Sequence, residues 1–177
     1  LVGSEMCIRD SLCNSIEKKD LKLQIIKAAN ALGMKNTFFN ADIMIKDGKS
    51  YIIEIGARAG GTCIPELMSI HLGVDYYGLM VANALGEKIV LKANDDVAAV
   101  GELLLSQVSG KIESIYSGED KLGGLCQISM DYQVGDEIKA FRVGPDRIGQ
   151  IIVKGNTVDD ALNNLSEAKK QFKIIVK

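Results

Sequence analysis

Tryptophan is absent from this 177-residue sequence, and histidine occurs once, as His71. A single histidine rules out a catalytic site built on a histidine pair and argues against a Ser-His-Asp triad. The four cysteines form no CxxC pair and no regular spacing; they are Cys7, Cys13, Cys63 and Cys126. This usage argues against a zinc site or a disulfide framework, and a reducing, cytoplasmic location is the default expectation.

An excess of positive charge and a long apolar run are also missing. Lys and Arg number 21 and Asp and Glu 23, for a formal net charge of −2. We therefore expect neither nucleic acid nor a membrane surface as a partner. No apolar run reaches the roughly 18–20 residues that span a bilayer. With 47% hydrophobic and 25% charged residues, the composition is typical of a soluble globular protein of one domain or two small ones.

The first eleven residues, LVGSEMCIRDS, lack helical or strand periodicity. They resemble translated sequencing-adapter read-through, and the alternative is an ordinary disordered tail. Residues 1–11 are therefore expected to be a non-native or disordered tail that contributes nothing to the fold. The true N-terminus is then expected to be missing, so the lack of a signal peptide carries no information.

Helical and strand patterns follow one another in the rest of the chain. Apolar spacing predicts helices that each end at a glycine, over residues 15–32, 65–72 and 75–85. Short β-rich runs follow, as in a small meander or sandwich, at 90–92, 98–105, 110–116, 125–132, 137–143 and 149–153. Thr157 is predicted to cap a helix over 158–172, and a last strand covers 173–176.

The segment 38–56 has the pattern of a β-hairpin around Lys46-Asp47-Gly48-Lys49. Odd-numbered positions are apolar on both sides of the turn, which predicts one buried face. A three-residue loop over 46–48, with Gly48 at positive φ in a bulge, would keep that face intact. A two-residue turn at Asp47-Gly48 would split it.

The opposite face of this hairpin would then gather Asn40, Asp42 and Glu54, with the two acids as diagonal cross-strand neighbours. Adjacent carboxylates repel unless a cation neutralises them, and Mg²⁺ is commonly held by one or two carboxylates together with nucleotide phosphates. A solvated polar face explains the same two acids without any ligand.

Arg58, Gly60 and Gly61 follow the second acid within eight residues. An arginine offers a planar fork of donors for phosphate or carboxylate oxygens, and glycines let backbone N–H groups approach an anion. Together with a metal-binding carboxylate they favour phosphoryl-transfer chemistry. The alternative is a salt-bridged arginine in a glycine-rich turn.

The stretch FFNADIMIKDGKSYIIEIGARAGGTCIPEL resembles the metal-binding hairpin of the ATP-grasp superfamily. The resemblance implies that Asp42 and Glu54 hold Mg²⁺ (or Mn²⁺) against the phosphates of ATP, and that Met44 lines the adenine pocket. It also implies that Arg58 is the catalytic arginine at the transferred phosphoryl group or acyl phosphate, beside substrate-binding Gly60 and Gly61. Many members have Asn where this chain has Gly56, so the number of metal ions stays open.

The tail FRVGPDRIGQIIVKGNTVDDALNNLSEAKKQFKI looks like the C-terminal segment of L-amino-acid ligases and related carboxylate–amine ligases. The two resemblances imply an α+β fold. Residues 12–90 would form the C-terminal part of an ATP-grasp domain, an antiparallel sheet backed by helices, and residues 91–177 a β-rich domain with the helix 158–172.

The implied function is that of an ATP-dependent ligase that joins a small carboxylate to an amine through an acyl phosphate, with a homo-oligomer left open. The lysines and glycine-rich loop that bind ATP in the family are not found here, so the chain is expected to be a fragment that is inactive alone. Two alternatives remain: a carboxylase or carbamoyl-phosphate-synthase-like enzyme that uses bicarbonate, and a non-catalytic binding module with a decayed site.

Four further residues are expected to be structural. His71 should lie at a helix end, and Asp146 and Arg147 should form a turn and its ion pair. Cys63 lies close enough to the Gly-Gly turn for a place in the pocket lining, but no base neighbours it in sequence, so a nucleophilic role is not expected.

Overall fold

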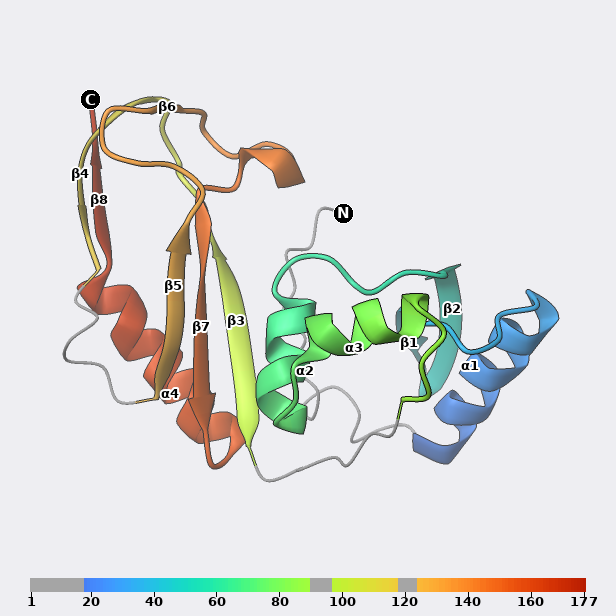
Figure 1. Ribbon diagram of the computed structural model, residues 1–177. Coiled ribbons are helices and arrows are strands. Elements are labelled where there is room, and N and C mark those ends of the chain that lie inside the picture. The colour runs from blue at the N-terminus through green and yellow to red at the C-terminus, as the bar shows by residue number, and fades with distance from the viewer. Residues whose placement is uncertain (1–17, 90–96, 118–123) are drawn as a thin grey trace.

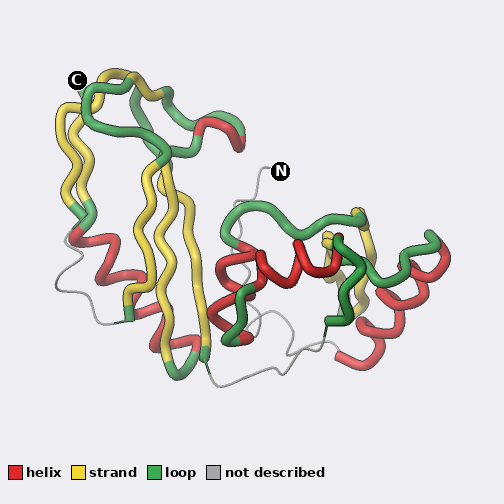
Figure 2. The backbone as a smooth tube through the Cα atoms, viewed as in Figure 1, coloured by secondary structure: helices red, strands yellow, loops and turns green. Residues whose placement is uncertain are grey.

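The computed structural model describes residues 18–89, 97–117 and 124–177. It has the predicted α+β architecture, with antiparallel sheets and packed helices (Figures 1 and 2). The helices are α1 (Lys18–Ala31), α2 (Ile64–Leu72), α3 (Tyr76–Ala84) and α4 (Val158–Gln171), with a short 3₁₀ turn η3 (Gly144–Asp146). The strands are β1 (Asn40–Lys46), β2 (Lys49–Gly56), β3 (Ala98–Leu104), β4 (Gly110–Tyr116), β5 (Leu125–Met130), β6 (Glu137–Ile138), β7 (Gly149–Gly155) and β8 (Lys173–Val176).

Strand β7 is the centre of the main sheet, which has the order β3-β7-β5. Ile151 and Val153 belong to the core under α4, whereas Ile152 packs with Cys63 and Leu67 on the α2 side. All three β7 residues are completely buried. Side chains of a strand alternate between its faces, so an unbroken apolar run fits a strand that is covered on both sides. Figure 1 shows α4 and α2 on opposite sides of this sheet.

A second sheet has the order β6-β4-β8. Of the two predicted arrangements, a meander or a sandwich, the strands do not form the meander, because β7 lies between β3 and β5 and the last strand pairs with β4. The predicted strand 137–143 is wrong beyond Ile138. The backbone N–H of Phe141 donates to the Ser106 carbonyl, and those of Arg142 and Val143 donate to the Asp146 carboxylate, so a loop uses these groups. The predicted run 90–92 lies outside the described residues.

The helix ends follow the capping residues in the sequence. Thr157 and Asp160 form a reciprocal capping box at the start of α4, with side-chain-to-backbone distances of 3.1 and 3.2 Å. Asp75 accepts a hydrogen bond from the Gly78 N–H at the start of α3. Gly33, Gly73 and Gly86 have φ values of +70°, +63° and +81°. Such φ values stop a helix at little cost only where the residue is glycine. No helix in the described part of the chain is long and apolar enough to cross a membrane.

The β1–β2 hairpin corrects the predicted turn. Asp47 and Gly48 have φ of +52° and +71°, and Lys46 pairs with Lys49, which is a two-residue turn with both central residues left-handed. The predicted three-residue loop is therefore wrong. A bulge follows between Asp42 and Ile43, and this irregularity restores even-to-even pairing at the open end.

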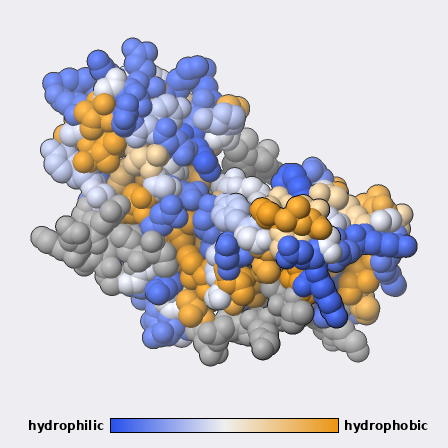
Figure 3. Space-filling view, viewed as in Figure 1, coloured by the Kyte–Doolittle hydropathy of each residue, from blue (hydrophilic) through white to orange (hydrophobic). Residues whose placement is uncertain are grey.

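The predicted buried odd-numbered face of the hairpin is also wrong for this chain. Ile53 is 63% exposed and Tyr51 46% exposed. The hairpin is a two-stranded sheet that contacts mainly α1, and Leu23 and Ile26 of α1 are themselves exposed. Hydrophobic surface is visible over this half of the molecule, on the right of Figure 3.

Candidate functional site

The two acidic residues that the sequence singled out face each other across the hairpin. Asp42 and Glu54 are direct cross-strand partners, closer than the predicted diagonal arrangement. Both are exposed. Like charges in directly opposite positions destabilise a strand pair, and a bound cation would relieve the repulsion.

Asn40 holds the first of these acids in place. Its Nδ2 donates a 3.1 Å hydrogen bond to Asp42 Oδ1. A Cβ added to Gly60 would lie 2.9 Å from the Asn40 amide oxygen and 2.7 Å from Ile64 Cδ1. The glycine therefore allows the loop after β2 to lie against the side chain that positions Asp42.

The loop from Gly56 to Cys63 leads from the acids to the start of α2. Thr62 and Cys63 both have left-handed φ values, +54° and +59°, a conformation that non-glycine residues rarely adopt outside functional or tightly determined sites. Cys63 is 6% exposed, and its Sγ lies 3.0 Å from Gln150 Oε1. This contact, together with the packing of Cys63 and Ile152, ties the loop to the main sheet.

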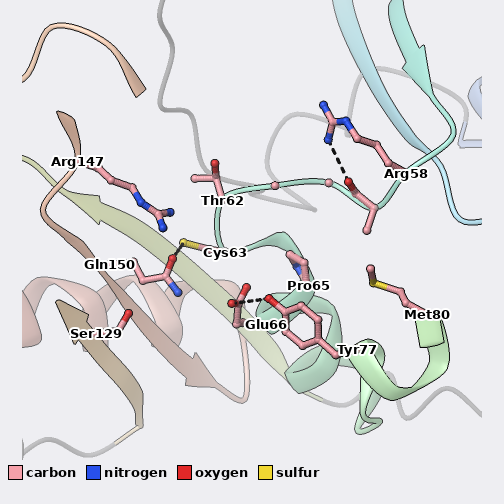
Figure 4. A pocket seen from close by; sticks show the side chains of 13 residues that line it. Arg58, Thr62, Cys63, Pro65, Glu66, Tyr77, Met80, Ser129, Arg147 and Gln150 are labelled. Atoms are coloured by element: carbon pink, nitrogen blue, oxygen red, sulfur yellow. Dashed lines mark hydrogen bonds between the residues drawn. The ribbon is translucent and has the colours of Figure 1, made fainter. Parts of the chain in front are cut away.

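A cleft of about 420 Å³ lies between this loop and the main sheet (Figure 4). One side is formed by the Gly-rich loop and the first turn of α2, and the other by the ends of β5 and β7. Its lining residues are Arg58, Ala59, Gly60, Gly61, Thr62, Cys63, Pro65, Glu66, Tyr77, Met80, Ser129, Arg147 and Gln150. Arg58, Gly60 and Gly61, predicted as substrate-contacting residues, thus share one cleft.

Two arginines from distant parts of the sequence line this cleft. Arg58 makes no ion pair with Asp42 or Glu54 in the described part of the chain; its Nη1 donates 3.0 Å to the Ala59 carbonyl. Arg147 Nε donates a 2.8 Å hydrogen bond to Asp131 Oδ2, so its ion pair is with Asp131. Asp146, the partner expected in the turn, instead accepts from the backbone N–H groups of Arg142 and Val143. The place of Arg147 in the cleft was not expected, because nothing in its local sequence pattern points to a site.

The wall of the cleft contributed by α2 and α3 carries two polar side chains, Glu66 and Tyr77. The Tyr77 hydroxyl donates a 2.8 Å hydrogen bond to Glu66 Oε1. That bond, with a smaller effect of burial, raises the pKa of the Tyr77 phenol above its ordinary value. Glu66 and Gln150 are further cleft residues that the sequence alone did not identify, because both lie within the two family-like stretches but neither was given a role there.

The remaining candidates lie away from this cleft. Met44 is 47% exposed on β1 and pairs with Tyr51. The expected position of His71 is confirmed: it lies in the last turn of α2, with Nδ1 2.9 Å from the Val97 carbonyl oxygen. The proposed contact of Met44 with adenine stays a prediction.

The donor set at the hairpin can be compared with what a divalent cation needs. Within residues 18–89, 97–117 and 124–177, no three His, Cys, Asp or Glu side chains are grouped to hold a metal alone. Two opposed carboxylates suit Mg²⁺, which usually keeps water ligands and takes others from substrate phosphates. Asp42 and Glu54 therefore fit a Mg²⁺ ion that is shared with a nucleotide.

Known families and solved structures include several that resemble this chain. Residues 102–177 match the family model described as L-amino acid ligase C-terminal domain 2. No curated protein sequence gives a significant match. The crystal structure of phosphoribosylglycinamide synthetase from Anaerococcus prevotii is 32% identical with a TM-score of 0.82, covering 90% of this chain and 42% of that one.

Two further solved structures share the fold at lower identity. L-amino acid ligase from Bacillus licheniformis is 22% identical, with a TM-score of 0.74 over 91% of this chain and 42% of that one. The biotin carboxylase domain of Hydrogenobacter thermophilus 2-oxoglutarate carboxylase, solved with MgADP and bicarbonate, is 17% identical, with a TM-score of 0.73 over 93% and 38%.

The chain has the fold of the ATP-grasp superfamily, and its residues 102–177 are similar to the L-amino acid ligase C-terminal domain. It spans about two fifths of the length of the solved structures that it matches.

Proposed function

We propose that this chain is the C-terminal part of an ATP-dependent ligase that activates a small carboxylate as an acyl phosphate and joins it to an amine. The observation that carries the proposal is the continuity between two features: Asp42 opposite Glu54 on the hairpin, and the cleft with two arginines to which the Gly56–Cys63 loop leads. A metal–phosphate site would thus adjoin an anion-binding cleft, as phosphoryl transfer to a carboxylate requires.

The hairpin supplies the nucleotide side of the reaction. Asp42, held by Asn40, and Glu54 would bind the metal. Mg²⁺ at this point would neutralise charge on the nucleotide phosphates and orient them. Met44, two residues from Asp42, is proposed to contact the adenine.

The cleft is proposed to bind the carboxylate substrate. Arg58 and Arg147 would bind the oxygens of the carboxylate substrate, and Arg58 would stay with the phosphoryl group as it is transferred. The Asp131 carboxylate fixes the Arg147 side chain at 2.8 Å, which reduces the ordering required on binding. No protein nucleophile is required, because the substrate carboxylate itself attacks the terminal phosphate.

The test uses the protein encoded by the complete open reading frame that contains this chain. Release of ADP and phosphate is measured with pooled amino acids and other small carboxylates, with and without amines. We compare the wild type with Glu54→Gln and with the control Glu102→Gln, whose side chain pairs with Lys169 on the surface of the main sheet.

We expect turnover that requires both an acid and an amine. It should fall at least about 100-fold in Glu54→Gln, because several kcal/mol of charge stabilisation are lost and about 1.4 kcal/mol corresponds to tenfold. Glu102→Gln should match the wild type. Turnover that requires bicarbonate would assign the protein to the carboxylases instead. Absence of both nucleotide turnover and Mg·ATP binding would leave a binding module.

A further inference from the structure

One charged group in the cleft has no place in the function proposed above. Glu66 lies in the first turn of α2, and its Oε1 accepts the hydrogen bond from Tyr77. Its second oxygen, Oε2, is buried and has no hydrogen-bond partner in the structure. An unpaired, buried carboxylate oxygen is unfavourable, and native proteins retain one mainly where a ligand or ordered water completes it.

Glu66 lies at a position of α2 from which a glutamate can form a local hydrogen bond to the start of its own helix. A glutamate three residues after the N-cap often folds back to accept the N-cap N–H, but Glu66 instead turns toward Tyr77. Figure 4 shows its carboxylate between Tyr77 and Gln150, with Arg58 and Arg147 in the upper part of the view. The cleft therefore has two cationic side chains and a separate anionic one, a distribution that suits two substrate groups of opposite charge.

We propose that Glu66 binds the amine substrate as its ammonium form and positions the nitrogen for attack. This inference rests on the proposed ligase function and extends it to the second substrate. Oε2 would accept a charge-assisted hydrogen bond from the ammonium group, while Tyr77 holds Oε1 and so fixes the plane of the carboxylate. A metal ion is a poor alternative occupant, since Glu66 is the only carboxylate among the residues that line the cleft.

The step balances with the groups named. The ammonium group transfers one proton to Glu66 Oε2, and the neutral nitrogen attacks the acyl carbon. The new C–N bond forms as the C–O bond to phosphate breaks, and phosphate leaves with the electron pair. The second proton lost by nitrogen passes to the departing phosphate, and Glu66 returns its own proton to water after the amide is released.

The test separates formation of the acyl phosphate from capture by the amine, again with the complete protein. Hydroxylamine is largely uncharged at neutral pH and traps acyl phosphates as hydroxamates, so it needs no ammonium site. Hydroxamate and amide formation are measured in parallel for the wild type, Glu66→Gln, Glu66→Asp and Glu102→Gln.

We expect Glu66→Gln to form hydroxamate within about threefold of the wild-type rate, but to lose about 10- to 100-fold in amide formation, through a higher KM for the amine. Glu66→Asp keeps the charge and should recover part of this loss. Equal losses in both assays, or no loss in either, would overturn the assignment. If Glu66→Gln fails to fold, an amine KM in Glu66→Asp equal to that of the wild type would overturn it. A wild type that forms no hydroxamate with any acid would refute the ligase function itself.

Discussion

The β7-centred sheet and the β1–β2 hairpin differ in where their apolar side chains lie. In β7, Ile151, Ile152 and Val153 have no exposed surface, because α4 covers one face and α2 the other. In the hairpin, Ile53 and Met44 are 63% and 47% exposed, and the main helix contact is with α1. The hairpin carries the predicted metal ligands, yet it has almost no core of its own.

The contrast shows how the cleft is stabilised. Its rigid side is the main sheet, which fixes Arg147 and Gln150 at the ends of its strands. Its other side is the strained loop after β2, which is anchored to the sheet through Cys63. The proposed chemistry thus depends on a well-packed region whose part in the cleft the sequence did not indicate.

The largest difference between the two regions should appear in stability. Ile151→Ala leaves a cavity in the core, and we expect it to lower the free energy of unfolding by about 2–5 kcal/mol. Ile53→Ala removes a side chain that is mostly exposed and should change it by less than about 0.5 kcal/mol. Urea unfolding of the chain measures both. Equal losses of unfolding free energy in the two variants would contradict the exposed position of Ile53.

Gly60 and Gly61 allow a matched comparison within the loop. A Cβ on Gly60 would meet Asn40 and Ile64 below 3 Å, whereas one on Gly61 has nothing within 4 Å. We expect Gly60→Ala to cost about 1–3 kcal/mol and to lower the affinity for Mg·ATP, because Asn40 is displaced from Asp42. Gly61→Ala should stay within about 0.5 kcal/mol. Urea unfolding measures the stability of the two variants, and nucleotide titration measures their affinity for Mg·ATP. Equal stability and equal affinity in both would contradict the close approach of Gly60 to β1.

A smaller effect is expected at the cap of α4. Thr157→Ala removes the side-chain acceptor for the Asp160 N–H and should cost about 1 kcal/mol. Ser166→Ala, at an exposed position of the same helix, serves as the control and should leave stability unchanged or slightly raised. Thermal unfolding distinguishes them; a stable Thr157→Ala variant would show that packing against β7 alone fixes the start of α4.

The smallest effect concerns the ionisation of Tyr77. Its hydrogen bond to Glu66 raises the phenol pKa above the ordinary value of 10.0. Because the pKa in the folded state is raised, the associated stabilisation is present below pH 10.0 and is lost as pH rises through the folded-state pKa. Ultraviolet titration, with Tyr77→Phe subtracted, should show a lower pKa in Glu66→Gln. An unchanged pKa would mean that the Tyr77–Glu66 contact is absent in solution.

Local sequence patterns determined much of the secondary structure. The glycine stops, the Asp75 and Thr157 caps and the run from Gln150 to Val153 mark their elements because each depends on nearby residues and backbone conformation. The same holds for Asp42, Glu54 and Arg58, which lie within one short motif. Their assigned roles, and the division at residue 90, stay predictions.

Other features were decided only by the tertiary structure. From Asn40 to Asp42, the Asp47-Gly48 turn and the bulge beyond it pair even with even positions, as the predicted loop would, so side-chain alternation could not distinguish the two. The cleft joins Arg58 and Glu66 to Arg147 and Gln150, which are distant in sequence, through the packing of α2 on β7. Sequence patterns report which neighbours a residue has along its own strand or helix, but not which distant element packs against it, and it is that packing which brings the second arginine and the unpaired carboxylate into one site.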